Sequence, residues 1–172
     1  ILELGTYSGG VTVNTALAIH NNSNNQNIDF IAVEHCPHNQ SINGKDQYYY
    51  CTQNLANAVG IDLRPYVDYI KTHAPSQKID SKLQQLNPIE LLIIDANGEL
   101  ADQLERYLPY CANGCILVID DYWMIEKWEL HKGPSVRACI NRLVDEGILR
   151  VVSLCTFSTI ILIYGDKDTL GE

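Results

Sequence analysis

The stretch Ile1-Leu2-Glu3-Leu4-Gly5-Thr6-Tyr7-Ser8-Gly9-Gly10 joins a short apolar run, which carries one acidic residue, to a glycine-rich turn. A helix-like run at residues 11–19 follows the turn directly. Glycine at positions 5 and 9 lets the backbone turn sharply and lets a ligand approach the main chain where a Cβ would intrude. The stretch therefore predicts a strand, a loop that can wrap a flat polar molecule, and a helix.

The spacing of the glycines indicates which kind of molecule fits the loop. A dinucleotide-binding fingerprint has the pattern G-x-G-x-x-G, because the pyrophosphate must rest on the helix N-terminus. Here Tyr7 takes the place of the second glycine, and Glu3 adds a negative charge beside the loop. The loop therefore favours a cationic, phosphate-free ligand such as S-adenosylmethionine, and it disfavours a nucleotide-dependent oxidoreductase.

The pattern Glu3-x-Gly5-x-x-x-Gly9 resembles the first motif of class I S-adenosylmethionine-dependent methyltransferases. Residues 2–9 are similar to the form found in metal-dependent small-molecule O-methyltransferases, both the catechol type and its sugar and macrolide O-methyltransferase relatives. The resemblance implies a Rossmann-like α/β fold whose seven strands have the order 3-2-1-4-5-7-6. It also implies cofactor contacts from five residues of this stretch, namely Glu3, Gly5, Thr6, Tyr7 and Gly9.

Strand-like apolar runs alternate with helix-like segments along the whole chain. The strand-like runs are residues 1–4, 29–33, 67–70, 90–94, 116–119, 149–154 and 159–164, and the helix-like segments are residues 11–19, 44–59, 79–85, 99–108 and 135–146. Short runs rich in Ile, Val and Leu on both faces are typical of parallel strands that helices cover on both sides. The last two runs are linked too closely for a parallel crossover, so we expect a mostly parallel sheet that ends in an antiparallel hairpin.

Size and composition limit the classes of function. The 172 residues predict a single domain, and the start inside a strand without Met favours an additional N-terminal segment upstream. A net charge of −9 with only 12 Lys and Arg residues argues against nucleic acid binding. No apolar run approaches the roughly 18 residues of a membrane span. The six cysteines contain no C-x-x-C pair, which is typical of a reduced, cytoplasmic protein, and a homodimer is compatible with the sequence.

In open α/β sheets, ligands bind beyond the carboxyl ends of the strands, and one predicted strand ends in Glu34. We assign Glu34 to the ribose hydroxyls of the cofactor, with a solvated strand-end carboxylate as the alternative. His35 follows it in a short turn that resembles the methyltransferase pattern. Thr72 and His73 follow the third strand, where the resemblance implies contact with adenine, although this chain lacks the usual Gly-Asp pair there.

Acidic residues also end the next two predicted strands. Asp95 ends one and Asp120-Asp121 ends the other, and the ends of neighbouring strands lie about 5 Å apart. Three crowded carboxylates need a proton or a cation to relieve their repulsion, and hard oxygen ligands favour Mg²⁺ or another divalent ion. The hypothesis is a metal site at Asp95, Asp120 and Asp121 that binds a small hydroxylated substrate, such as a sugar or a natural-product intermediate. Asp95 would also contact the cofactor and accept the substrate proton.

One departure from the family pattern leaves a second class of function open. Asp95 is followed by Ala96-Asn97-Gly98, where catechol-type members carry a catalytic Lys and several relatives carry a His. Asp95 then acts alone, the metal ionises the substrate, or the chain is a non-catalytic module of a larger protein that keeps the fold. The aromatic stretch with Tyr122, Trp123, Trp128 and His131 is either a substrate wall or packing against the last helix.

Overall fold

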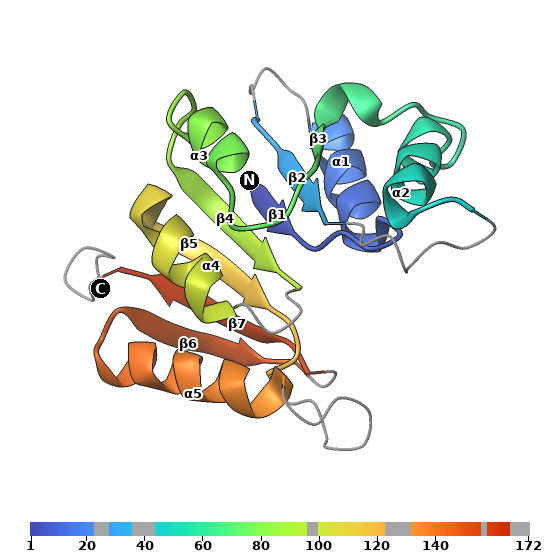
Figure 1. The fold of residues 1–172 in the computed structure, drawn as a ribbon. Helices are drawn as coiled ribbons and strands as arrows, with labels where there is room; N and C mark the ends of the chain where they lie inside the picture. Colours follow the sequence, from blue (N-terminus) through green and yellow to red (C-terminus); the bar gives the residue numbers. More distant parts are fainter. Residues whose placement is uncertain (23–27, 36–43, 96–99, 123–131, 156–157, 166–172) are drawn as a thin grey trace. The chain divides into compact units, whose positions relative to one another are not determined.

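The computed structural model describes residues 1–22, 28–35, 44–95, 100–122, 132–155 and 158–165. These residues form two compact units, Ile1–Asn87 and Pro88–Glu172. Figure 1 shows strands alternating with helices along the chain, except that the last two strands follow each other without a helix between them. No helix of the described ranges is long and apolar enough to cross a membrane.

The first unit is a parallel three-stranded sheet with its helices. Its strands have the order β3-β2-β1, with Leu2 opposite Ile31 and Ile31 opposite Asp68. Every residue of β1 and β2 is buried, as expected where helices cover a sheet. The elements are β1 (Leu2–Leu4), α1 (Gly10–Asn22), β2 (Ile31–Glu34), α2 (Gln47–Ala56), the 3-10 helix η1 (Arg64–Tyr66), β3 (Asp68–Lys71) and α3 (Gln77–Leu83).

Helices α1 and α2 pack against each other over one face of β2. Their shared core holds residues from both helices, from β2 and the residue before it, and from the segment before η1, namely Ala16, Ile19, Phe30, Ala32, Cys51, Leu55 and Leu63. Asp46 caps the N-terminus of α2, where its carboxylate accepts a hydrogen bond from the Tyr49 amide at 2.9 Å. This packing fixes α2 beside the segment that leads from β1 into α1.

The second unit is a mixed four-stranded sheet in the order β4-β5-β7-β6. Strands β4 and β5 are parallel, whereas β7 is antiparallel to both β5 and β6. Helices α4 and α5 contact each other, and α5 runs along β6 (Figure 1). The elements are β4 (Ile89–Ile94), α4 (Leu100–Tyr107), the 3-10 helix η2 (Leu108–Tyr110), β5 (Cys111–Ile119), α5 (Lys132–Asp145), β6 (Leu149–Leu154) and β7 (Ile160–Tyr164).

The predicted mostly parallel α/β fold with a C-terminal antiparallel hairpin is confirmed, and the two strand orders are the two parts of the expected order. The largest difference in bounds is at β5, which begins at Cys111 rather than at residue 116. Ile89 lies opposite Cys111 and Leu91 lies opposite Ile116, so β5 has extra residues that bulge between these pairs. Apolar periodicity does not show such a bulge, because its residues break the pattern of a strand.

Candidate active site

The glycine loop, residues 5–9, leaves β1 and enters α1 through left-handed backbone. Gly5 has a φ of 85°, Tyr7 of 49° and Gly9 of 89°. The Gly5 amide donates to the Val33 carbonyl at 3.0 Å, and the Gly9 amide donates to the Thr6 carbonyl at 2.8 Å. Glycine has no Cβ to oppose a positive φ, so its two positions allow this sharp reversal. The loop therefore has the shape that the sequence predicts.

Gly9 also meets a packing requirement that the sequence does not show. A Cβ on Gly9 would lie 2.5 Å from the Cys51 Sγ atom of α2. The Cys51 side chain is fully buried, and burial raises the pKa of its thiol, so Cys51 is a neutral packing group under the loop. Glycine at this position is needed because α2 approaches the backbone closely.

Glu34 holds the glycine loop through one carboxylate oxygen. Its Oε2 accepts hydrogen bonds from the Thr6 amide at 3.0 Å, the Tyr7 amide at 2.6 Å and the Thr6 hydroxyl at 3.2 Å. The residue is only 7% exposed, so these bonds lie in a largely desolvated place, where charge-assisted bonds are strong. The alternative of a solvated strand-end acid is therefore wrong, and Glu34 orders the loop.

A tyrosine on β3 extends this set of contacts. The Tyr69 hydroxyl lies 2.9 Å from the Thr6 Oγ1. The Tyr69 ring stacks on Tyr48 of α2, with centroids 4.5 Å apart and planes 4° from parallel. Burial raises the pKa of Tyr69, so its hydroxyl stays protonated. The loop is thus held from β2 by Glu34 and from β3 by Tyr69.

Glu3, the acidic residue of the first motif, lies buried beside the start of α1. Its Oε1 accepts a hydrogen bond from the Thr12 hydroxyl at 3.0 Å. This hydrogen bond ties β1 to the first turn of α1.

The other predicted cofactor residues of this unit gather at the carboxyl ends of β2 and β3. The Thr72 amide donates to the Glu34 carbonyl at 3.0 Å. The His35 and His73 rings meet edge to face, with centroids 4.2 Å apart, and both residues are exposed. The first unit thus brings together the glycine loop, Glu34, His35, Thr72 and His73 at one edge of its sheet.

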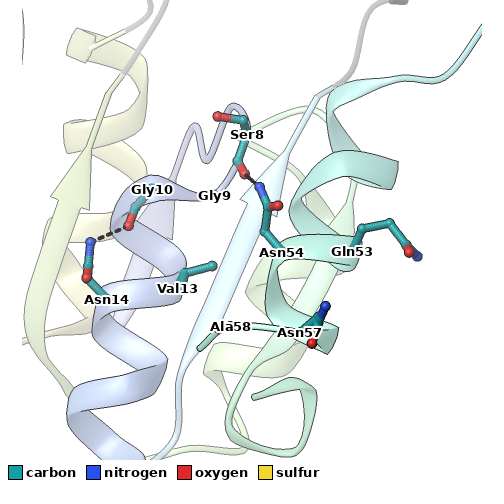
Figure 2. A pocket seen from close by; sticks show the side chains of 9 residues that line it. All are labelled: Ser8, Gly9, Gly10, Val13, Asn14, Gln53, Asn54, Asn57 and Ala58. Carbon is teal, nitrogen blue, oxygen red and sulfur yellow. Dashed lines mark hydrogen bonds between the residues drawn. The ribbon is translucent and has the colours of Figure 1, made fainter. Parts of the chain in front are cut away.

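A groove lies on the α2 side of the loop (Figure 2). Its volume is about 590 Å³, and Ser8, Gly9, Gly10, Val13, Asn14, Gln53, Asn54, Asn57 and Ala58 line it. The Asn54 Nδ2 donates to the Ser8 carbonyl at 2.8 Å, and the Asn14 Nδ2 donates to the Gly10 carbonyl at 2.8 Å. Only Gly9 of the predicted cofactor residues lines this groove. At this groove, the hydrogen bond from Asn54 to the Ser8 carbonyl fastens the loop to α2.

In the second unit, the acidic strand ends have separate surroundings. The Asp120 Oδ1 accepts hydrogen bonds from the Ser158 hydroxyl at 2.7 Å and the Thr159 hydroxyl at 3.0 Å, which tie the end of β5 to the start of β7. Asp121 is buried and has a φ of 63°, whereas Asp95 at the end of β4 is exposed. The Asp120 amide donates to the Ile94 carbonyl at 3.0 Å, so β4 and β5 do end side by side as predicted.

The predicted three-carboxylate metal cluster does not form among the residues that the structure describes. No group of three or more His, Cys, Asp or Glu side chains there could hold a metal ion. The Asp120 carboxylate accepts hydrogen bonds from two hydroxyls of the hairpin. The backbone of the next residue, Asp121, is left-handed, which changes the direction of the chain there. Adjacent strand ends are therefore not sufficient for a ligand cluster, because the directions of the side chains also determine whether their oxygens meet. Residues 96–99 and 123–131, with Trp123, Trp128 and His131, lie outside the described ranges.

Comparison with known proteins decides the family. The sequence profile of a family described as a methyltransferase domain matches residues 2–122. The chain belongs to this methyltransferase domain family. No curated protein matches the sequence.

Solved structures share the fold of this methyltransferase domain at low sequence identity. An O-methyltransferase from Bacillus cereus in complex with SAH has 17% identity and a TM-score of 0.65, covering 95% of this chain and 72% of that one. TomG, the Streptomyces achromogenes O-methyltransferase of tomaymycin synthesis in complex with SAM, has 16% identity and a TM-score of 0.69, with 96% and 72% covered. A TDP-rhamnose 3'-O-methyltransferase of calicheamicin biosynthesis also has 16% identity and a TM-score of 0.69, with 96% and 72% covered.

Sequence reasoning missed three residues that shape the methyltransferase loop. Tyr69 and Cys51 hold the loop or pack beneath it, and Asn54 binds its Ser8 carbonyl. For Tyr69 the sequence offers only a weak signal, namely that the residue belongs to a short strand that ends beside predicted ligand contacts. The other two lie on α2, far from the loop in sequence, and only the packing of α1 on α2 reveals them.

Proposed function

We propose that this methyltransferase domain transfers a methyl group from S-adenosylmethionine to a hydroxyl group of a small molecule. The observation that carries the proposal is the Glu34 carboxylate bound to the Thr6 and Tyr7 amides at the carboxyl ends of parallel strands. Ligands of open α/β sheets bind at this edge. The O-methyltransferase names of similar solved structures, two of them holding SAM or its product SAH, support the same reaction.

The residues at this edge fit S-adenosylmethionine. The glycine loop has no Lys or Arg, so it offers no side-chain charge for a phosphate group. Beside it, His35 and His73 present exposed rings suited to a flat purine, and Glu34 supplies an acceptor suited to ribose hydroxyls. When bound, the cofactor supplies an electrophilic methyl group on its sulfonium. The chain contributes an ordered loop, a buried negative charge at Glu34 and an acceptor for the substrate proton.

We assign that acceptor to Asp95, which is exposed at the end of β4. A hydroxyl oxygen becomes a better nucleophile as it loses its proton, and a positioned carboxylate can take that proton. Asp95→Asn is expected to lower the rate of methyl transfer at least about 100-fold, the usual contribution of a general base. It should leave cofactor affinity within about twofold, because the amide keeps the shape of the side chain.

The described carboxylates do not fit the predicted Mg²⁺ site, so no step of this mechanism is routed through a metal ion. A small hydroxylated substrate, such as a sugar or a natural-product intermediate, is proposed from the names of the similar structures. A homodimer and a cytoplasmic location remain predictions from the sequence.

The test is a two-stage measurement on the wild-type chain. SAH is titrated into the protein in a calorimeter with and without Mg²⁺, and NAD serves as the control ligand. We expect SAH to bind with micromolar affinity and NAD not to bind. Radiolabelled S-adenosylmethionine is then incubated with a panel of diols and sugars. SAH binding without transfer to any acceptor would favour the non-catalytic module, which the absence of Lys or His after Asp95 also suggests. Binding of NAD instead of SAH would contradict the proposal.

A further inference from the structure

We propose that Tyr69 is a positioning residue for the cofactor ribose. Its hydroxyl acts through the Thr6 hydroxyl to hold the Glu34 carboxylate in the orientation that receives the ribose. The inference rests on the proposed function, because it names a residue that prepares the same site.

The direction of the hydrogen bonds supports this role. The Thr6 hydroxyl has one hydrogen, which it donates to the Glu34 Oε2 at 3.2 Å. The Tyr69 hydroxyl, 2.9 Å from the Thr6 oxygen, must then be the donor to Thr6. A donor at Thr6 polarises the Thr6 hydroxyl and strengthens its bond to the carboxylate. The relay from Tyr69 through Thr6 therefore ends on the oxygen that also binds the loop amides.

The surroundings hold the Tyr69 ring in one place. Tyr48 stacks flat against it at 4.5 Å, and Lys71, two residues further along β3, pairs with Asp46 at the N-terminus of α2. Both contacts join β3 to the start of α2, and both leave the Tyr69 hydroxyl directed at Thr6. A relay group with a fixed ring loses little conformational entropy when it forms its bond, so its hydroxyl can orient Thr6 at low cost.

The experiment removes the hydroxyl and keeps the ring. Tyr69→Phe is expected to weaken SAH binding about 3- to 10-fold, which corresponds to one neutral hydrogen bond. The same titration uses an SAH analogue without the ribose 2'- and 3'-hydroxyls. If Tyr69 acts on the ribose through Glu34, wild type and Tyr69→Phe bind this analogue within about twofold of each other. Equal losses for SAH and for the analogue would assign Tyr69 a merely structural role and overturn the inference.

Tyr66→Phe is the matched control. The Tyr66 hydroxyl also makes a 2.9 Å hydrogen bond, to His20 Nδ1, in the same unit but away from the loop. The Tyr66→Phe substitution should change the melting temperature by about as much as Tyr69→Phe does, and it should leave SAH affinity unchanged. Thr6→Val, which removes the relay hydroxyl, should reproduce the loss of Tyr69→Phe, and Thr6→Ser should restore wild-type affinity.

The outcomes separate this inference from the function on which it rests. If the folded wild-type chain does not bind SAH, the proposed function fails and the inference fails with it. If wild type binds SAH and Tyr69→Phe binds it equally well, the inference alone is overturned.

Discussion

Glu34 and Asp120 occupy similar places, since each follows the last apolar residue of a strand that pairs in parallel with a neighbour, yet the two acids make different contacts. Glu34 binds the Thr6 and Tyr7 amides of the glycine loop. Asp120 binds the hydroxyls of Ser158 and Thr159 at the start of β7. The first carboxylate orders a loop that can hold a ligand, whereas the second fastens the C-terminal hairpin. The function of a strand-end acid is therefore decided by the donors that the neighbouring elements present to it.

The same contrast separates the proposed cofactor residues of the first unit from the proposed acceptor-side residues of the second unit. Glu34, Thr6 and Tyr69 form a connected set of hydrogen bonds within the protein itself. Such preorganisation lowers the entropic cost of binding. Among the described residues of the second unit, the acids do not form an equivalent set that could hold a metal ion.

The largest expected effect comes from Gly9→Ala. The new Cβ would lie 2.5 Å from the Cys51 Sγ in a backbone with a φ of 89°, so either the loop or α2 must shift. We expect a loss of stability of about 2–4 kcal/mol and loss of detectable SAH binding. Chemical denaturation and calorimetry measure the two effects.

Gly60→Ala separates backbone strain from the clash in this experiment. Gly60 has a similar φ of 80°, but a Cβ there would have no neighbour within 4 Å. Gly60→Ala should lower the free energy of unfolding by about 1 kcal/mol and leave SAH affinity unchanged. Adding Cys51→Ala to Gly9→Ala should recover part of the lost stability. Equal effects of the two glycine substitutions would show that contact with α2 is unimportant.

Glu34→Gln is expected to have the next largest effect and tests the comparison directly. The amide has one acceptor oxygen and no charge, so the bonds to the Thr6 and Tyr7 amides weaken. Because hydrogen bonds to a charged group contribute about 1.5–3 kcal/mol, SAH affinity should fall at least about 10-fold. Asp120→Asn is the matched control in the other unit, and its SAH affinity should stay within about twofold of wild type. Equal loss of SAH affinity in both variants would remove the distinction between the two acids.

Asp120→Ala is expected to act on stability rather than on the cofactor. It removes the acceptor of the Ser158 and Thr159 hydroxyls and should destabilise the chain by about 1–3 kcal/mol, whereas Asp120→Asn keeps an acceptor and loses less. Thermal unfolding with and without Mg²⁺ measures this. If Mg²⁺ raised the melting temperature of wild type and not of Asp120→Ala, the role assigned here to Asp120 would have to include a metal ion.

Asp46→Asn should have the smallest effect. Asn keeps the cap of α2 but loses the charge that pairs with Lys71, and an exposed pair contributes less than about 1 kcal/mol. The Lys71 ammonium holds the pKa of Asp46 below its usual value, so this stability is present above the unfolded pKa of about 3.9 and is lost as pH falls through the folded value. The stability difference between wild type and Asp46→Asn should thus be constant from about pH 7 to 5 and shrink below about pH 4. A difference that grew on acidification would contradict this sign.

The sequence predicts the fold well because its apolar periodicity is simple. Every predicted strand and helix is found, and the short link between β6 and β7 correctly indicates a hairpin. The Glu3-x-Gly5-x-x-x-Gly9 pattern also locates the loop and its two left-handed glycines correctly, but it does not show the left-handed backbone at Tyr7. These features depend on neighbours in sequence, so local patterns are sufficient to predict them.

Contacts between distant residues were not predictable in this way. Gly9 meets Cys51 and Thr6 meets Tyr69 only after α2 and β3 pack beside the loop. The metal cluster is predicted from the acidic ends of two neighbouring strands, but the Asp120 carboxylate binds hydroxyls that come almost forty residues later in the chain. A strand order gives the distance between strand ends, and the direction of each side chain depends on partners that the pattern does not identify.

The most direct test of the central claim, that Glu34 and the glycine loop form the cofactor site, is parallel calorimetric titration of SAH into wild type and Glu34→Gln. We expect micromolar SAH binding to wild type and at least about tenfold weaker binding to Glu34→Gln, while circular dichroism shows both proteins to be folded. Equal SAH affinity in the two proteins, or no binding to folded wild type, would contradict it.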